Sequence, residues 1–188
     1  MGRYNFDKIV DRKHTKSLKY DFAVQRGKPA DVLPFWVADM DFEIPSELKQ
    51  VLLDRVNHGI FGYTESDDAY FNVLKQWFAS RFDWNIDKKW LVKTPGVVFA
   101  LAMAVRAFTK EGEGVLINQP VYYPFSMVID DNDRNLINVP LIQGEDRYTI
   151  DFEGVERAII EHNVTLFLLC NPHNPVGRVW TEEELKRL

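Results

Sequence analysis

The sequence contains a single cysteine, Cys170, so an internal disulfide framework is excluded. Its opening residues, MGRYNFDKIVDRKH, lack the apolar segment of a secretory signal peptide. No apolar run is long enough to span a bilayer, and no basic stripe or cationic amphipathic helix accompanies the net charge of −5. These absences argue against nucleic acids and membranes as partners, and they favour a cytoplasmic protein.

The composition provides enough apolar material for a folded core, since 46% of the 188 residues are hydrophobic and 27% are charged. Three short apolar runs are typical of buried strands: 115–117, 136–139 and 164–170. Helical patterns lie around them at 99–108, 125–130 and 152–161. This alternation predicts an α/β fold, with a mainly parallel sheet sandwiched between helices.

Two helices are predicted upstream of these strands. Pro45 suits the start of the first, and Gly59 suits its C-cap. The residues between them place an apolar stripe on one face: Leu48, Val51, Leu52 and Val56. The second helix follows Ser66, with Tyr70, Val73, Leu74 and Trp77 as its stripe.

The last segment predicts another helix, because Thr181 and Glu184 form a Thr-x-x-Glu capping box. The sequence then stops at Leu188. Isolated short helices are marginal in water, so we expect the sequence to be the N-terminal part of a longer protein. A short C-terminal helix docked on the fold is the alternative.

The most informative segment is LLCNPHNPVGR, at 168–178, in which an apolar strand leads into two Asn-Pro pairs and a glycine. Proline disfavours the helical conformation in the residue before it, so this loop is expected to be rigid. It also follows the carboxyl end of a strand, where α/β sheets bind ligands. A plain turn is the alternative, because Asn, Pro and Gly are common turn residues.

The spacing Asn-Pro-x-Asn-Pro-x-Gly after an apolar strand resembles the signature of class I and II aminotransferases. These are fold-type I enzymes that use pyridoxal 5'-phosphate (PLP). The resemblance implies a PLP-dependent transferase-like large domain, incomplete in this chain. It also implies that Asn174 donates a hydrogen bond to the ring hydroxyl oxygen of the cofactor and holds the ring in place.

Two further segments resemble parts of the same family's cofactor site. In KTPGVVFAL, Gly96 would let the backbone approach the phosphate, and the amides of Val97 and Val98 would face it. Many relatives have a hydroxyl side chain here, so the valines leave only backbone contacts. In PVYY, Tyr122 would stack on the pyridine ring. A glycine turn and a core aromatic are the respective alternatives.

Tyr63 resembles the family tyrosine that reaches the cofactor phosphate of the neighbouring subunit, which would make the full-length protein a homodimer. A surface loop tyrosine is the alternative. The opening Tyr4–Arg12 and the segment LPFWVADMDF, at 33–42, resemble the cystathionine β-lyase branch of the family. In that branch the backbone of Val37, Ala38 and Asp39 would line the substrate pocket.

The resemblance implies β-elimination from an amino-acid substrate. Cystathionine or a similar cysteine S-conjugate would give a thiol, pyruvate and ammonia. Two alternatives remain: an aminotransferase on the same fold, and a non-catalytic binding or regulatory module. The Schiff-base lysine is expected beyond Leu188, so no catalytic residue is assigned in this chain, and we expect the chain alone to be inactive.

The resemblance places an N-terminal arm and small-domain segment at 1–45 and a partial PLP-binding large domain at 46–188. No metal site is expected, because the histidines lack metal-ligand spacing. Surface positions are predicted for all of them: His14, His58, His162 and His173. Cys170, at the end of an apolar strand, is expected to be a buried, inert thiol.

Overall fold

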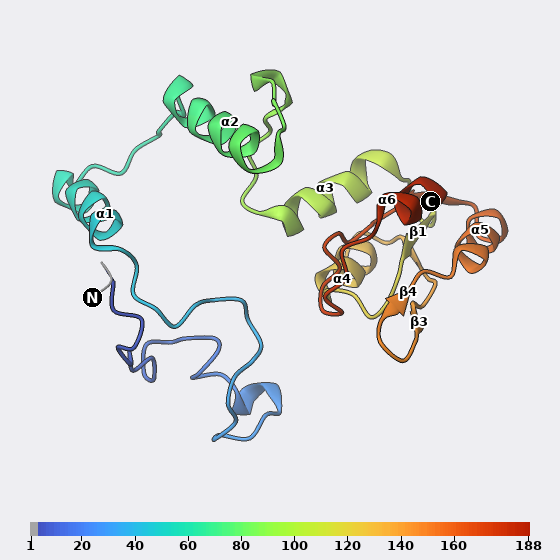
Figure 1. Cartoon of the computed structure of the whole chain (residues 1–188), viewed down its shortest axis with the longest axis horizontal. Coiled ribbons are helices and arrows are strands. Elements are labelled where there is room, and N and C mark those ends of the chain that lie inside the picture. The colour runs from blue at the N-terminus through green and yellow to red at the C-terminus, as the bar shows by residue number, and fades with distance from the viewer. Residues whose placement is uncertain (1–3) are drawn as a thin grey trace. The chain divides into compact units, whose positions relative to one another are not determined.

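The computed structural model describes residues 4–188 (Figure 1). The chain divides into two compact units. The first extends to Asn72, and the second is Val73–Leu188. The division falls within helix α2 (Asp68–Phe82). This division reflects contacts within the chain and does not test the domain boundary that the sequence predicts between residues 45 and 46. That boundary stays a prediction.

The N-terminal unit has little regular structure before helix α1 (Ser46–His58), apart from a 3-10 helix at Val24–Arg26. Helix α1 begins directly after Pro45 and ends at Gly59, as the sequence predicts. Gly59 adopts a left-handed conformation with φ of 75°, and its N–H donates to the carbonyl of Val56. Glycine suits this cap because it lacks the Cβ that penalises a left-handed backbone.

The C-terminal unit is built on a parallel sheet with the strand order β2–β1–β5. Strand β1 (Gly114–Ile117) lies between β2 (Asn135–Asn138) and β5 (Val164–Phe167). All three predicted strands are therefore confirmed. Strand β5 is shorter than the predicted 164–170. Leu168 N–H still donates to the carbonyl of Leu116 at 2.9 Å, and the chain then turns into the Asn-Pro loop.

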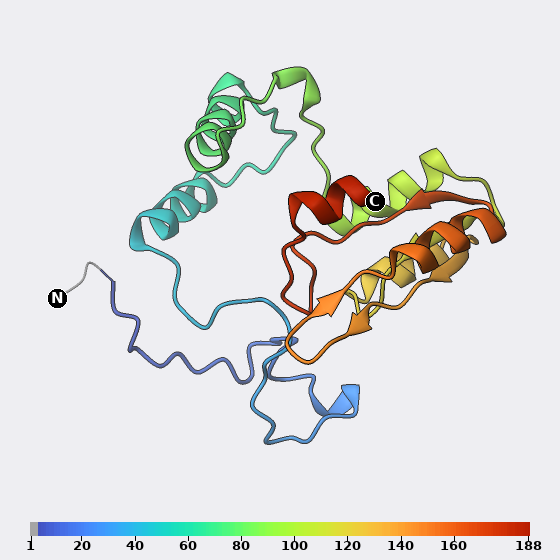
Figure 2. The same ribbon diagram turned by 45° about the vertical axis from the view of Figure 1, so that its right-hand side comes forward.

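The three predicted helices are present: α3 (Val97–Phe108) precedes β1, α4 (Pro124–Asp130) lies between β1 and β2, and α5 (Phe152–Glu161) precedes β5. The capping box of Thr181 starts helix α6 (Glu182–Arg187), which ends the chain in dark red in Figure 2. A 3-10 helix at Lys88–Trp90 and an antiparallel pair, β3 (Ile142–Gln143) with β4 (Tyr148–Thr149), were not predicted. Strands this short carry no readable periodicity.

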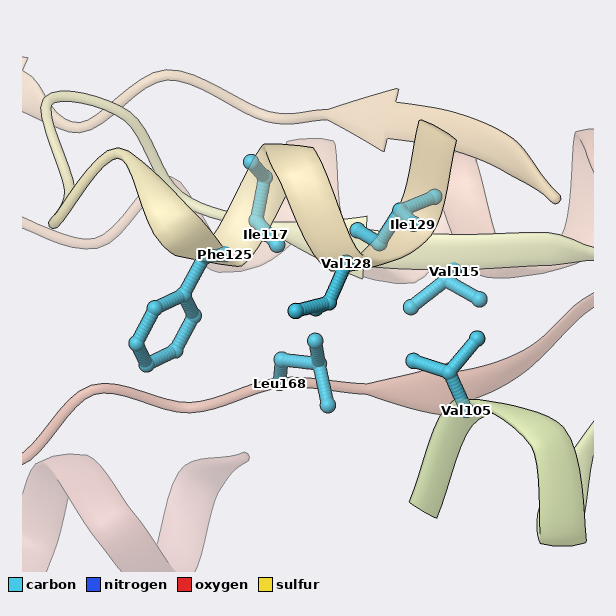
Figure 3. Close-up of a cluster of buried hydrophobic side chains, with 7 residues drawn as sticks. All are labelled: Val105, Val115, Ile117, Phe125, Val128, Ile129 and Leu168. Atoms are coloured by element: carbon cyan, nitrogen blue, oxygen red, sulfur yellow. The ribbon is translucent and has the colours of Figure 1, made fainter. Parts of the chain in front are cut away.

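Strand β1 is the centre of the hydrophobic core, because its side chains alternate between the two faces of the sheet. Val115 and Ile117 point to one face, where they pack with residues of α3 and α4 (Figure 3). Leu116 points to the other face and packs with residues of α5 and with Trp180. All three β1 side chains are fully buried. The predicted coverage of both sheet faces is thus confirmed.

Within residues 4–188, no helix has the length and apolar character needed to cross a lipid bilayer.

The burial of core side chains predicts how substitutions change the free energy of unfolding. Ile129 of α4 is fully buried, whereas Ile160 of α5 is 74% exposed. Ile129→Ala should lower the free energy of unfolding by about 2–5 kcal/mol, because it leaves a cavity as well as losing buried surface. Ile160→Ala, the matched control, should change it by less than about 0.5 kcal/mol. Urea unfolding followed by circular dichroism measures both, and equal effects would contradict this assignment of the core.

Candidate functional site

Two of the residues predicted to bind the cofactor, Tyr122 and Asn174, lie in loops that follow neighbouring strands of the parallel sheet. Parallel strands end at a common edge, and ligands in α/β folds bind there. Strand β1 leads into the loop Asn118–Tyr123, which contains Tyr122, and β5 leads into the Asn-Pro loop at 171–178, which contains Asn174. Both loops belong to the C-terminal unit, as does the start of α3.

The N-terminus of α3 is uncapped by any side chain. Gly96 is the N-cap residue, with extended backbone, and its carbonyl accepts from Ala100 N–H at 3.2 Å. The amides of Val97 and Val98 precede that first helical bond, and α3 has no acidic residue in its first turn. A Cβ built at Gly96 would meet no atom within 4 Å. Free amides, a positive helix end and open space together suit an anion.

The loop after β1 is held by hydrogen bonds to the last residue of β2 and to the residue that follows it. Asn118 is buried, and its Nδ2 donates to the carbonyl of Val139 at 2.8 Å. Gln119 N–H donates to Asn138 Oδ1 at 3.0 Å. Tyr122 follows this anchored part with 39% of its surface exposed, so it is not a core aromatic. An anchored loop thus presents an accessible tyrosine ring.

The Asn-Pro loop is folded back on itself by hydrogen bonds. His173 N–H donates to the carbonyl of Arg178 at 2.6 Å, and Trp180 N–H donates to Asn171 Oδ1 at 3.2 Å. Asn174 is exposed, and its backbone N–H donates to Cys170 Sγ at 3.4 Å. Within residues 4–188, no hydrogen bond involves the side-chain amide of Asn174. That amide is therefore available to a ligand.

The structure corrects the prediction for His173, which is not a surface residue but is only 2% exposed. Its Nε2–H donates to the carbonyl of Pro120 at 3.0 Å, and its ring lies 5.3 Å from that of Trp180, edge to face. Burial lowers the pKa of His173 below its usual value, although the carbonyls of Pro120 and Asn118 act to raise it. The imidazole is therefore neutral at pH 7.

The other predictions for histidine and cysteine differ in outcome. His14, His58 and His162 are exposed, as expected. Cys170 is only half-buried, and its Sγ also contacts the carbonyl of Pro172 at 3.4 Å. No group of three or more His, Cys, Asp or Glu side chains within residues 4–188 is arranged to hold a metal ion.

The Asn-Pro loop is also connected to the start of α6. The guanidinium of Arg178 forms an ion pair with Glu184 and lies 4.8 Å from the centre of the Trp180 ring. Glu184 also accepts from Thr181 N–H at 2.8 Å, while its own N–H donates to Thr181 Oγ1 at 3.2 Å. The predicted capping box therefore also fixes Arg178, a role that no sequence pattern indicates.

The other predicted site residues, Tyr63 and Val37–Asp39, belong to the N-terminal unit. Tyr63 is fully exposed. Val37 has a φ of 62°, a left-handed conformation that is strained in a β-branched residue. This strain lies within the segment 33–42, which in sequence resembles the cystathionine β-lyase branch.

Two cations hold the carboxylates that follow Val37. Arg12 pairs with Asp39 at 2.5 Å and with Asp41 at 2.6 Å, while Lys19 pairs with Asp41 at 3.1 Å. The hydrogen bond and charge of Arg12 lower the pKa of Asp39 and, together with Lys19, lower the pKa of Asp41 to about 2. Arg12 lies in the opening motif, but no local pattern identifies Asp39 and Asp41 as its partners.

The fold and these loops define an α/β protein of a known family, and the sequence pattern of "Aminotransferase class I and II" matches residues 30–188. The chain belongs to this family. It is 43% identical over 184 residues to cystathionine beta-lyase PatB of Bacillus subtilis, covering 98% of this chain and 48% of PatB. The chain spans about half the length of the curated relatives it matches.

The crystal structure of cystalysin from Treponema denticola, which contains a pyridoxal 5'-phosphate cofactor, aligns with a TM-score of 0.87 and 40% identity. That alignment covers 98% of this chain and 47% of cystalysin. The aspartate aminotransferase of Sulfolobus acidocaldarius is 25% identical over 195 residues, covering 100% of this chain and 48% of that enzyme.

The ion pairs of Arg12 make a prediction about acid titration. Arg12→Gln should raise the pKa of Asp41 from about 2 toward the ordinary value of about 4, because the carboxylate loses its largest stabilising partner. A carboxyl whose pKa is lowered by folding stabilises the fold above its unfolded pKa. This contribution is lost as the pH falls from about 4 toward 2.

Carbon-13 NMR of the Asp41 carboxyl measures this titration. Lys13→Gln is the matched control, since it removes one positive charge from the adjacent exposed residue. It should leave the Asp41 titration nearly unchanged. An unchanged pKa of Asp41 in Arg12→Gln would contradict the ion pairing.

Proposed function

We propose that the protein containing this chain is a PLP-dependent carbon–sulfur β-lyase. It cleaves cystathionine or a similar cysteine S-conjugate to a thiol, pyruvate and ammonia, and it works as a cytoplasmic homodimer. The observation that carries this proposal is the 43% identity to a cystathionine beta-lyase over 98% of the chain.

The residues present fit PLP. Its phosphate is an anion, and the amides of Val97 and Val98 at the uncapped start of α3 would hold it. The accessible ring of Tyr122 would cover one face of the pyridine ring, and the Asn174 amide would donate to the ring hydroxyl oxygen. When bound, PLP supplies an electron sink for the carbanion that forms when the substrate loses its α proton.

The chain's own contribution is binding and orientation. Tyr122 would exclude water from the ring face that it covers, and Asn174 would fix the rotation of the ring in its plane. The backbone of Val37, Ala38 and Asp39 would line the substrate pocket. The ion pairs of Asp39 with Arg12 would keep that backbone in its strained conformation before the substrate arrives.

Two further functions remain: a contact with the neighbouring subunit's cofactor, and the covalent attachment of the cofactor to a lysine. Tyr63, which is fully exposed here, would reach the cofactor phosphate of the neighbouring subunit. No lysine of the chain is assigned to covalent cofactor binding. The chain alone is therefore expected to release no pyruvate from cystathionine.

The experiment that tests the proposed function uses the protein expressed at its natural full length and loaded with PLP. Release of pyruvate and free thiol from cystathionine, without a keto acid, would support the lyase. Transfer of the amino group to an added keto acid, without free thiol, would contradict it and favour the aminotransferase alternative, which the family match makes the second candidate.

The phosphate contact makes a separate prediction. Val98 is 39% exposed at the start of α3. Val98→Asp should weaken PLP binding at least about tenfold, because its carboxylate repels the phosphate at short range. The same change should stabilise α3 by about 0.3–1 kcal/mol, because an acid near a helix N-terminus interacts favourably with the dipole.

Val98→Asn is the matched control, with similar size and no charge, and it should bind PLP nearly as the wild type does. Fluorescence titration measures PLP affinity, and thermal unfolding without PLP measures stability. Equal loss of affinity in both variants would argue that the phosphate does not lie at the start of α3.

A further inference from the structure

The two loops that carry Tyr122 and Asn174 come from different parts of the sequence and follow the neighbouring strands β1 and β5. A flat ring can contact both side chains only if the two loops are held at a fixed separation. Hydrogen bonds along each strand pair hold the strands, but the loops begin where strand pairing ends. A contact that connects the two loops directly would fix this separation.

The imidazole of His173 makes such a contact. His173 directly precedes Asn174 in the Asn-Pro loop, and its Nε2–H donates to the carbonyl of Pro120 at 3.0 Å. Pro120 lies in the other loop, just before Val121 and Tyr122. This hydrogen bond thus connects the backbone two residues before Tyr122 with the residue that directly precedes Asn174.

The surroundings of His173 leave its ring little freedom. The ring is packed edge to face on Trp180, which is itself only 3% exposed. Trp180 is held in turn, because its Nε1–H donates to the carbonyl of Cys170 at 3.0 Å and the guanidinium of Arg178 lies over its ring. The backbone of His173 is fixed as well, by its N–H bond to the carbonyl of Arg178. The imidazole is therefore a rigid connector.

We propose that His173 is a positioning residue, whose imidazole holds the loop bearing Tyr122 in register with the loop bearing Asn174. It touches neither substrate nor cofactor, and it acts through these two neighbours. This inference rests on the proposed binding of PLP, and it adds a residue that fixes the geometry of that site.

Three variants separate the hydrogen bond from the other properties of the side chain. His173→Gln keeps a donor at the position of Nε2, because the glutamine amide nitrogen lies as many bonds from Cβ. His173→Asn has the same amide one bond closer, so it cannot reach Pro120. His173→Phe keeps a ring that can pack on Trp180 but has no donor.

The first measurement is amide hydrogen exchange of the full-length protein without PLP. His173→Asn and His173→Phe should speed exchange in peptides that cover Asn118–Phe125, while Val115–Ile117 of β1 stays protected. His173→Gln should exchange like the wild type. A destabilisation of the whole fold would instead speed exchange in β1 as well, so the comparison separates a local role from a global one.

The second measurement is affinity, by fluorescence titration with PLP and with inorganic phosphate. His173→Asn and His173→Phe should weaken PLP binding by roughly five- to tenfold, the size expected from one lost buried hydrogen bond. Binding of inorganic phosphate should not change, because the start of α3 is untouched. His173→Gln should restore PLP affinity to nearly the wild-type value.

The outcomes distinguish this inference from the proposed function. Unchanged exchange in Asn118–Phe125 for both His173→Asn and His173→Phe would overturn the positioning role, whether or not PLP binds. Faster exchange with unchanged PLP affinity would also overturn it. If the wild-type protein binds no PLP, the proposed function fails. Faster loop exchange that His173→Gln reverses would then still support the connection between the loops.

Discussion

The burial of strand β1 on both of its faces is the constraint on which the rest of the C-terminal unit depends. Val115 and Ile117 fill one side of the sheet, Leu116 fills the other, and none of the three is accessible to solvent. Side chains that alternate in this way require helices on both faces. They also fix the register of β1 against β2 and β5, so the edge at which the candidate site lies is determined by the core.

Beyond the ends of the strands, hydrogen bonds of buried polar side chains hold the loops in place. Asn118 and His173 are buried polar side chains at this edge, and each donates to a backbone carbonyl of another segment. A buried donor without a partner costs about 1–3 kcal/mol, so loss of the contact of Asn118 Nδ2 or His173 Nε2 is unfavourable. They tie the loop after β1 to the chain after β2 on one side and to the Asn-Pro loop on the other.

Features encoded by neighbouring residues could be predicted from the sequence. Helix α5 has the predicted bounds, Gly59 caps α1, and Thr181 starts α6, because periodicity and capping depend on residues within a few positions. The β3–β4 pair was missed because two-residue strands show no period. The exposure of Tyr122 and Asn174 agrees with a ligand role, but their contact with a cofactor stays a prediction.

The wrong prediction for His173 and the unpredicted pairing of Asp39 with Arg12 share a physical cause. His173 is buried because it bonds to Pro120, far away in the sequence, and Asp39 is held by Arg12 in the same way. No local window contains both partners of either contact. Val37 also violates a local rule, since a β-branched residue rarely adopts a positive φ. Local rules tend to fail where function imposes a geometry of its own. These residues fall in the Asn-Pro loop and in the segment 33–42, the two segments most closely tied to the proposed chemistry.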